Sequence, residues 1–160
     1  MLIKLGKYVI HVSGGYLKMA NLTIEVDRKN SSALLPPWST GLICKSKIVN
    51  PITYGLQDLQ YWQYYNVDLR CNGPLVYNFL TKKNFLRRCL GVEDLIAMDA
   101  IFFSLIKQKF HIRKIFAWRS AVRRMGENIF VPYREEDEDL IQWWKIRYSE
   151  EDDYSALMFH

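Results

Sequence analysis

The strongest constraint on the fold is a helical periodicity that runs from Val92 to Phe110. Its apolar residues recur in steps of three and four, as on a helix with one buried side, and only Asp99 interrupts them. These positions are Val92, Leu95, Ile96, Phe102, Phe103, Ile106 and Phe110. Acidic residues stand in the first turn and lysines near the end, as the helix dipole favours. One long amphipathic helix is therefore expected, and a second layer must cover its apolar side.

That second layer is predicted to be an antiparallel sheet. Residues 4–12 and 16–27 are rich in β-branched and aromatic residues, and the glycines between them are typical of a hairpin turn. Leu22, Ile24 and Val26 alternate with polar residues, which indicates a half-buried strand. The alternating aromatic stretch 61–70 is the strongest predicted strand.

A second helix is expected from Leu75 to Cys89, with Pro74 in its first turn, where its missing N–H costs nothing. Residues 28–58 are rich in loop signals, with room for a short strand between Gly41 and Val49. Residues 110–113 favour a strand and residues 115–125 a helix, but the pattern there is ambiguous. A short strand is expected at 129–131, before Pro132.

The predicted fold class is therefore α+β. We expect a single domain with an antiparallel sheet, built largely from the N-terminal half, and two or three helices packed on one face. The 160 residues suit one domain, and the 49% apolar fraction suffices for a core. The predicted division is a basic body, residues 1–133, and an acidic aromatic C-terminal segment, residues 134–160.

Charge separates these two parts. Residues 1–133 carry a net charge of +11 and residues 134–160 a net charge of −6. The acidic blocks Glu135–Asp139 and Glu150–Asp153 flank an aromatic stretch that contains Trp143 and Trp144. Three interpretations stay open: a solvated tail, a segment that competes with an anionic partner, or a segment that binds a neighbouring copy. Two adjacent indoles are unusual in water, so we expect this stretch to pack on the body as a final strand or short helix.

The sequence favours an intracellular protein that is neither secreted nor transmembrane. Residues 1–11 alternate polar and apolar, unlike a secretion signal, and Leu95–Ile106 is too short to cross a bilayer. The three cysteines are far apart and odd in number, as in a reducing compartment.

Motifs for catalysis, for cofactors and for metals are not found. The three histidines lack metal-ligand spacing, and there is no phosphate-binding glycine loop or nucleophile elbow. A catalytic dyad of Cys71 and His111 stays open only because the members of such pairs meet in space and need not be close in sequence. The prediction is a non-enzymatic protein with no cofactor, no metal and no small-molecule substrate.

Basic side chains dominate residues 82–124, where eleven cations stand within 43 residues. They are Lys82, Lys83, Arg87, Arg88, Lys107, Lys109, Arg113, Lys114, Arg119, Arg123 and Arg124. Lone buried charges are costly, so an exposed basic surface is expected. It either only aids solubility or attracts a polyanion: nucleic acid through counterion release, or an anionic bilayer. Trp118 beside Arg119 is a candidate for base stacking or the lipid interface, although a buried Trp is the commoner outcome.

Two aromatic segments are candidates for docking a protein partner. One contains Leu34, Pro36, Pro37 and Trp38, and its prolines favour an extended conformation. The alternative is that it packs on the core. The other is the pair Trp143 and Trp144.

Residues 61–95 carry a family resemblance. The aromatic strand, the turn with Arg70, Asn72 and Pro74, and the following amphipathic helix resemble the core of rhabdovirus matrix proteins, from negative-strand RNA viruses. These often carry a Pro-Pro-x-Tyr motif, which Pro36-Pro37-Trp-Ser is not. The resemblance implies a small basic virion protein without catalysis that self-associates and bridges ribonucleoprotein to anionic membrane.

The expected function is thus a viral structural protein of matrix type, peripheral on anionic membrane in the host cytoplasm. Two alternatives remain: an RNA-binding viral accessory protein that suppresses host defence, and a protein-binding adaptor. A membrane role requires basic residues coplanar with exposed apolar side chains. An RNA role requires a basic groove with exposed stacking rings, and an adaptor requires an apolar groove.

Overall fold

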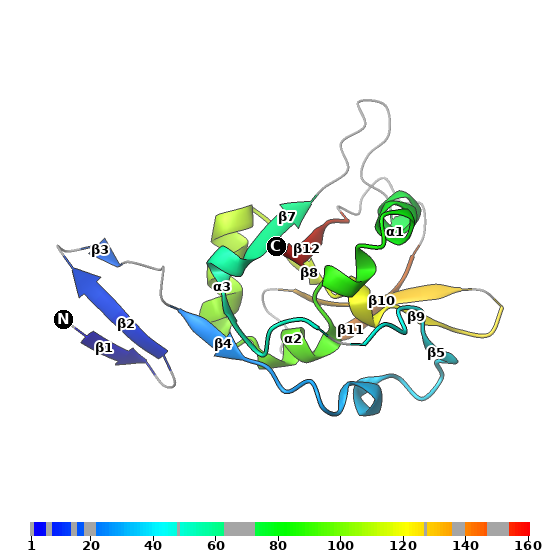
Figure 1. Cartoon of the computed structure of the whole chain (residues 1–160), viewed down its shortest axis with the longest axis horizontal. Coiled ribbons are helices and arrows are strands. Elements are labelled where there is room, and N and C mark those ends of the chain that lie inside the picture. The colour runs from blue at the N-terminus through cyan, green and yellow to red at the C-terminus, as the bar shows by residue number, and fades with distance from the viewer. Residues whose placement is uncertain are drawn as a thin grey trace.

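The computed structural model describes residues 22–47, 49–62, 73–126, 128–135, 140–146 and 154–160, and the backbone of three strands before them. The expected class is confirmed: the chain forms a single α+β domain with antiparallel sheets and, among the described residues, three α-helices (Figure 1). The helices are α1 (Gly73–Lys82), α2 (Val92–Ala97) and α3 (Ala100–Phe110). Short 3-10 turns η2 (Ser31–Leu34), η3 (Leu56–Asp58), η4 (Leu86–Arg88) and η5 (Trp118–Ser120) connect other elements.

The strands form several small antiparallel sheets instead of one. The N-terminal sheet has β1 (Leu2–Leu5), β2 (Tyr8–Ser13) and β3 (Tyr16–Leu17) in chain order, with the expected turn between β2 and β3. Two pairs follow, β4 (Thr23–Glu25) with β6 (Thr53–Gly55), and β7 (Leu59–Trp62) with β12 (Ala156–Phe159). In β4 the predicted alternation is confirmed, with Ile24 buried between exposed neighbours.

The largest sheet comes mainly from the second half of the chain, so the expected N-terminal origin is wrong for this sheet. Its strands are β5 (Gly41–Leu42), β8 (Lys114–Phe116), β9 (Val122–Arg123), β10 (Ile129–Glu135) and β11 (Gln142–Lys145). β10 runs through Pro132, where a strand end was predicted. Proline is tolerated there because the neighbour of β10 changes from β9 to β8 on either side of it.

The long helix expected from Val92 to Phe110 is broken into α2 and α3. The break lies at Asp99, the residue that interrupts the apolar periodicity. Its carboxylate accepts a hydrogen bond from the Phe102 amide at 2.9 Å and caps α3. The helix expected at 115–125 is also wrong, because β8, η5 and β9 occupy that stretch.

Helix α1 begins where Pro74 was expected to fit the first turn, but it ends before Cys89. Asn84 takes a positive φ of 57°, and the Phe85 amide donates back to the Leu80 carbonyl at 2.8 Å. This is the Schellman arrangement that ends helices. The strand predicted at 61–70 is described only in its first residues, since 63–72 lie outside the described residues.

Two packed clusters make up the core, and the C-terminal strand belongs to both. Leu157 and Phe159 pack in the first cluster with α2, α3, β4 and β6. Tyr154 and Met158 pack in the second with α1, β8 and β10. All four residues of β12 are buried. The end of the acidic segment is therefore part of the core, and Trp143 and Trp144 lie on β11, paired with β10.

Candidate anion-binding face

The predicted basic cluster divides into two groups in space. One group lies at the end of α1, around η4 and on β9, and the other lies at the end of α3 and the start of β8. Figure 1 shows α1 and α3 in different parts of the molecule. The sequence interval 82–124 therefore does not correspond to one surface.

The first group is extended by a segment that sequence reasoning missed. β5 pairs with β9, and the Ile43 amide donates to the Ala121 carbonyl at 3.1 Å. Ile43 and Cys44 then pack against the cluster that holds Phe79 and Phe85, beside α1 and η4. Lys45 and Lys47 follow and are exposed. No signal in the sequence joins them to residues 82–124, because the β5–β9 pairing creates the proximity.

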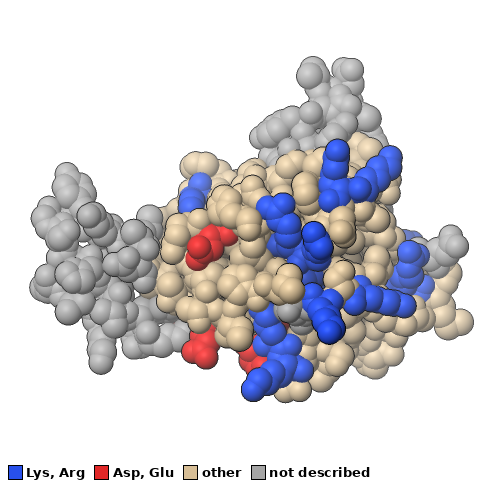
Figure 2. Space-filling model, viewed as in Figure 1, with Lys and Arg blue, Asp and Glu red and all other residues tan. Residues whose placement is uncertain are grey.

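We define the basic face by exposed side chains of these elements. It consists of Lys45, Lys47, Lys82, Lys83, Arg87, Arg123 and Arg124. Figure 2 shows Lys and Arg gathered from α1 down to the region of β5 and β9, while the acidic side chains seen in this view lie toward β4. Arg88 lies at its border: it is half-buried, and its guanidinium donates to the Phe159 carbonyl at 2.9 and 3.1 Å.

Exposed aliphatic side chains accompany these cations. Met125 is 83% exposed at the turn between β9 and β10, directly after Arg124. The turn is closed by a hydrogen bond of 2.9 Å from the Arg124 amide to the Asn128 carbonyl, with Gly126 at a φ of 89°. Val49, close in sequence to Lys47, is 78% exposed.

The described aromatic rings near the basic face are covered. Trp38 is half-buried, with Phe130 at 4.7 Å and Trp143 at 6.1 Å between ring centroids, and Arg124 lies over it at 5.3 Å. Phe85 is half-buried under Arg88 at 5.2 Å. Among the described residues, every Trp, Tyr and Phe is buried or half-buried.

Trp118 and Arg119 are not surface residues, which corrects two predicted site positions. Trp118 is fully buried, and its indole N–H donates to the Ser155 carbonyl at 2.7 Å. Arg119 is 7% exposed and forms an ion pair with Glu93. Both lie in η5, which is held against residue 90 by the bond from the Arg119 amide to the Leu90 carbonyl.

Several cations of the second group are engaged within the fold. Lys114 lies 3.3 Å from Glu135 and 4.2 Å from the centroid of the Trp144 ring. Lys109 donates to the Leu56 carbonyl at 2.9 Å. Arg113 is exposed and Lys107 is half-buried. This group is therefore weaker as a ligand surface than the basic face.

The two predicted docking segments meet at Trp38 and Trp143. Trp38 contacts Trp143 on one side of the β10–β11 pair, whereas Trp144 packs on the other side against Tyr133 at 5.3 Å. Leu34 and Pro37 are exposed and Pro36 is half-buried. Trp38 thus packs against the body, which was the alternative reading of this segment.

A buried charge cluster, also missed at the sequence level, supports the elements behind the basic face. The Asp94 carboxylate accepts from Arg28 at 2.9 and 3.0 Å, from the Tyr54 hydroxyl at 2.9 Å and from the Gly91 amide at 2.7 Å. Glu93 accepts from Arg28 at 3.1 Å and from Arg119. The only sequence signal was the acidic first turn of the expected helix. In the structure these acids face inward, with Asp94 fully buried.

Burial and charge shift the titration of this cluster. Burial lowers the pKa of Arg28, but the hydrogen bond and charge of Asp94 outweigh it and raise that pKa overall. The pKa of Tyr54 lies well above its usual range, first because of burial and then because of Asp94. Burial likewise raises the pKa of the Cys89 thiol. Arg28 therefore stays charged and Tyr54 stays neutral at physiological pH.

Among the described residues, no group of three or more His, Cys, Asp or Glu is placed to hold a metal ion. In the same part of the chain, the helices are too short or too polar to cross a membrane. Comparison with models of protein families, with curated proteins and with solved structures finds no match. The resemblance to rhabdovirus matrix proteins stays a prediction.

Proposed function

We propose that the protein is non-enzymatic and binds anionic membrane surfaces peripherally through the basic face. The observation that carries this proposal is the combination of seven exposed cations with exposed Met125 and Val49 on or beside the same elements. Basic residues hold such a protein near anionic lipid, and an aliphatic side chain enters the interface between them.

The expected affinity depends mainly on charge. Each Lys or Arg near an anionic bilayer contributes about 1 kcal/mol. If four to seven of these cations act together, they contribute about 4–7 kcal/mol, and burial of Met125 adds about 1.5–3 kcal/mol. This sum of about 5.5–10 kcal/mol corresponds to a dissociation constant between about 100 μM and about 50 nM.

The same geometry is less suited to nucleic acid. Single-stranded RNA is usually held by exposed rings on which bases stack. Trp38 and Phe85, two described rings beside the basic face, already carry Arg124 and Arg88 on their faces. Base stacking there would have to displace these arginines. RNA binding is therefore the alternative that the flotation experiment described below distinguishes.

The wider proposal is a role of matrix type, which rests on the sequence resemblance and on the charge separation. In that role the basic face meets membrane, and the acidic blocks Glu135–Asp139 and Glu150–Asp153 promote contact with a neighbouring copy. Neutralising Glu135–Asp139 is expected to reduce the oligomer size at low salt, measured by light scattering. An unchanged size would contradict this mode of self-association.

Flotation with vesicles tests the membrane proposal. Vesicles of phosphatidylcholine alone are compared with vesicles that also contain phosphatidylserine, at low and high salt and with competing single-stranded RNA. We expect flotation only with phosphatidylserine, loss at high salt and persistence in the presence of RNA. Failure to float, with tight salt-sensitive binding of RNA, would replace the membrane proposal by the RNA alternative.

Met125 provides a test of insertion separate from charge. Met125→Ser removes the aliphatic side chain and leaves all seven cations in place. We expect weaker flotation that persists at a reduced level, because the electrostatic part of the binding remains. Ile96→Ser, a 53% exposed position on α2, is the matched control.

A further inference from the structure

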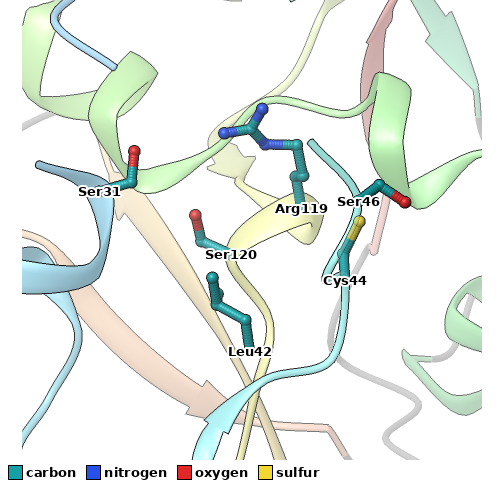
Figure 3. Close-up of a pocket in the computed structure, with 6 residues that line it drawn as sticks. All are labelled: Ser31, Leu42, Cys44, Ser46, Arg119 and Ser120. Carbon is teal, nitrogen blue, oxygen red and sulfur yellow. The ribbon is translucent and has the colours of Figure 1, made fainter. Parts of the chain in front are cut away.

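A small pocket lies beside the buried charge cluster. It has a volume of about 40 Å³ and is lined by Ser31, Leu42, Cys44, Ser46, Arg119 and Ser120. A single water needs about 10–15 Å³, so the pocket has room for a larger polar group. Figure 3 shows the Arg119 guanidinium between Ser31 on one side and Cys44 and Ser46 on the other, with the Ser120 hydroxyl below it.

Arg119 supplies a buried donor that the described residues leave unused. Its Nη2 atom is held by Glu93, and the residue is 7% exposed. Its Nη1 atom is buried without a hydrogen-bond partner in the described part of the chain. An unpaired buried donor is costly, and a guanidinium is well matched to oxygen atoms of carboxylate or phosphate. The pocket therefore favours an occupant that offers acceptor oxygens.

Serine hydroxyls provide further donors at the same place. The Ser120 oxygen accepts from the Val92 amide at 2.7 Å, so its own proton is left to donate. The Ser31 hydroxyl donates to the Arg28 carbonyl at 3.2 Å and can rotate toward a stronger acceptor. Ser46 lies at the exposed rim. None of the described residues that line the pocket carries a carboxylate.

The surrounding charges do not oppose an anion. Arg28 and Arg119 balance Glu93 and Asp94, so this cluster is neutral. Exposed Lys45 and Lys47 flank Ser46 at the rim. Glu93 has one oxygen, Oε2, that is buried without a hydrogen-bond partner among the described residues, but it does not line the pocket.

We propose that this pocket binds a phosphate group, with Arg119 Nη1 and the Ser120 hydroxyl as the inner donors and Ser46 at the entrance. The group is tetrahedral and offers several acceptor oxygens, which suits a guanidinium together with hydroxyls. Its source is either free phosphate or a phosphomonoester head group of a lipid. The proposal does not depend on the membrane role of the basic face.

The test is a titration of the full chain with inorganic phosphate, followed by NMR of the arginine side chains. We expect saturable shifts of the Arg119 signals. Ser46→Trp fills the exposed entrance and leaves the Arg119–Glu93 pair intact, and it should weaken phosphate binding about tenfold or more. Ser104→Trp, an exposed serine on α3, is the matched control and should bind as the wild type does. Arg119→Lys, checked for folding by circular dichroism, should also weaken binding.

Vesicles distinguish the two sources of phosphate. If the lipid head group is the ligand, wild type floats better with phosphatidic acid than with phosphatidylserine, and Ser46→Trp loses only this preference. If free phosphate is the ligand, both lipids bind equally. The absence of saturable shifts at Arg119, or equal phosphate binding by wild type and Ser46→Trp, would overturn the proposal whatever the outcome with phosphatidylserine.

Discussion

Replacing Asp94 by alanine removes the centre of the buried charge cluster. The carboxylate accepts four hydrogen bonds, two of them from Arg28, and it is fully buried. The loss leaves the Arg28 guanidinium with a side-chain exposure of only 7% and with Glu93 as its remaining acidic partner. The Tyr54 hydroxyl and the Gly91 amide each lose an acceptor.

The expected cost follows from these contacts. Removing one partner of a buried ion pair costs about 3–5 kcal/mol. Adding about 1.5–3 kcal/mol for each of four charge-assisted bonds would exceed this range. The cost of about 3–5 kcal/mol applies, and not the larger sum, because Arg28 still pairs with Glu93 and still donates to the Pro51 carbonyl at 2.7 and 3.1 Å. A domain is typically stable by about 5–15 kcal/mol, so Asp94→Ala should remove a large part of the free energy of unfolding.

Urea unfolding followed by circular dichroism measures this cost. Glu25→Ala, an exposed acid on β4, is the control and should change the free energy of unfolding by less than about 0.5 kcal/mol. Arg28→Met and the double variant complete a cycle, with a coupling of about 1–3 kcal/mol expected between the two sites. If Asp94→Ala is too unstable to measure, Asp94→Asn replaces it. A loss below about 1 kcal/mol, or additive effects, would refute the reasoning.

Three further predictions concern single groups. Asp99→Ala should cost about 1 kcal/mol in urea unfolding, since it removes the cap of α3. Above about pH 10 an unfolded chain ionises Tyr54 whereas the fold keeps it neutral, so the free energy of unfolding should fall as pH rises. For Tyr54→Phe the free energy of unfolding should fall less steeply with pH than for wild type, by up to about 1.4 kcal/mol per pH unit. An identical slope in the two proteins would contradict the raised pKa of Tyr54. Cys89 should resist iodoacetamide until urea unfolds the protein, as peptide mass mapping would show, because its thiol is buried and its pKa is raised.

Local patterns were sufficient for much of the fold. Alternation placed Ile24 inside β4, the turn chemistry placed Pro74 in the first turn of α1, and the two indoles on β11 pack on the body as expected for that pair. These features depend on neighbours within a few residues, which the sequence displays directly.

Features that depend on distant contacts could not be predicted. The sequence around Asp99 is compatible with one continuous helix that tolerates a polar residue and with two helices, the second capped by Asp99. Which of the two forms depends on how α2 and α3 pack. The sequence around Trp118 and Arg119 does not distinguish an exposed pair from a buried one. Their burial follows from the residue before β12, Ser155, whose carbonyl accepts from the Trp118 indole, and from Glu93 on α2.

The candidate site was predicted only in part for the same reason. The cations at 82–88 and 123–124 were identified from composition, but their separation from Lys107–Lys114 depends on the path of the chain after α1. Lys45 and Lys47 joined the basic face through the pairing of β5 with β9, a contact across about 80 residues.

Comparison of two charge reversals tests the central claim most directly. Arg123→Glu lies on the basic face, and Arg113→Glu lies in the second group; both residues are exposed, and both variants change the net charge equally. With phosphatidylserine vesicles at low salt, Arg123→Glu should weaken binding by about 2 kcal/mol, or about thirtyfold, whereas Arg113→Glu should stay close to wild type. Equal losses for the two variants would show that only net charge matters and would contradict a membrane-binding face.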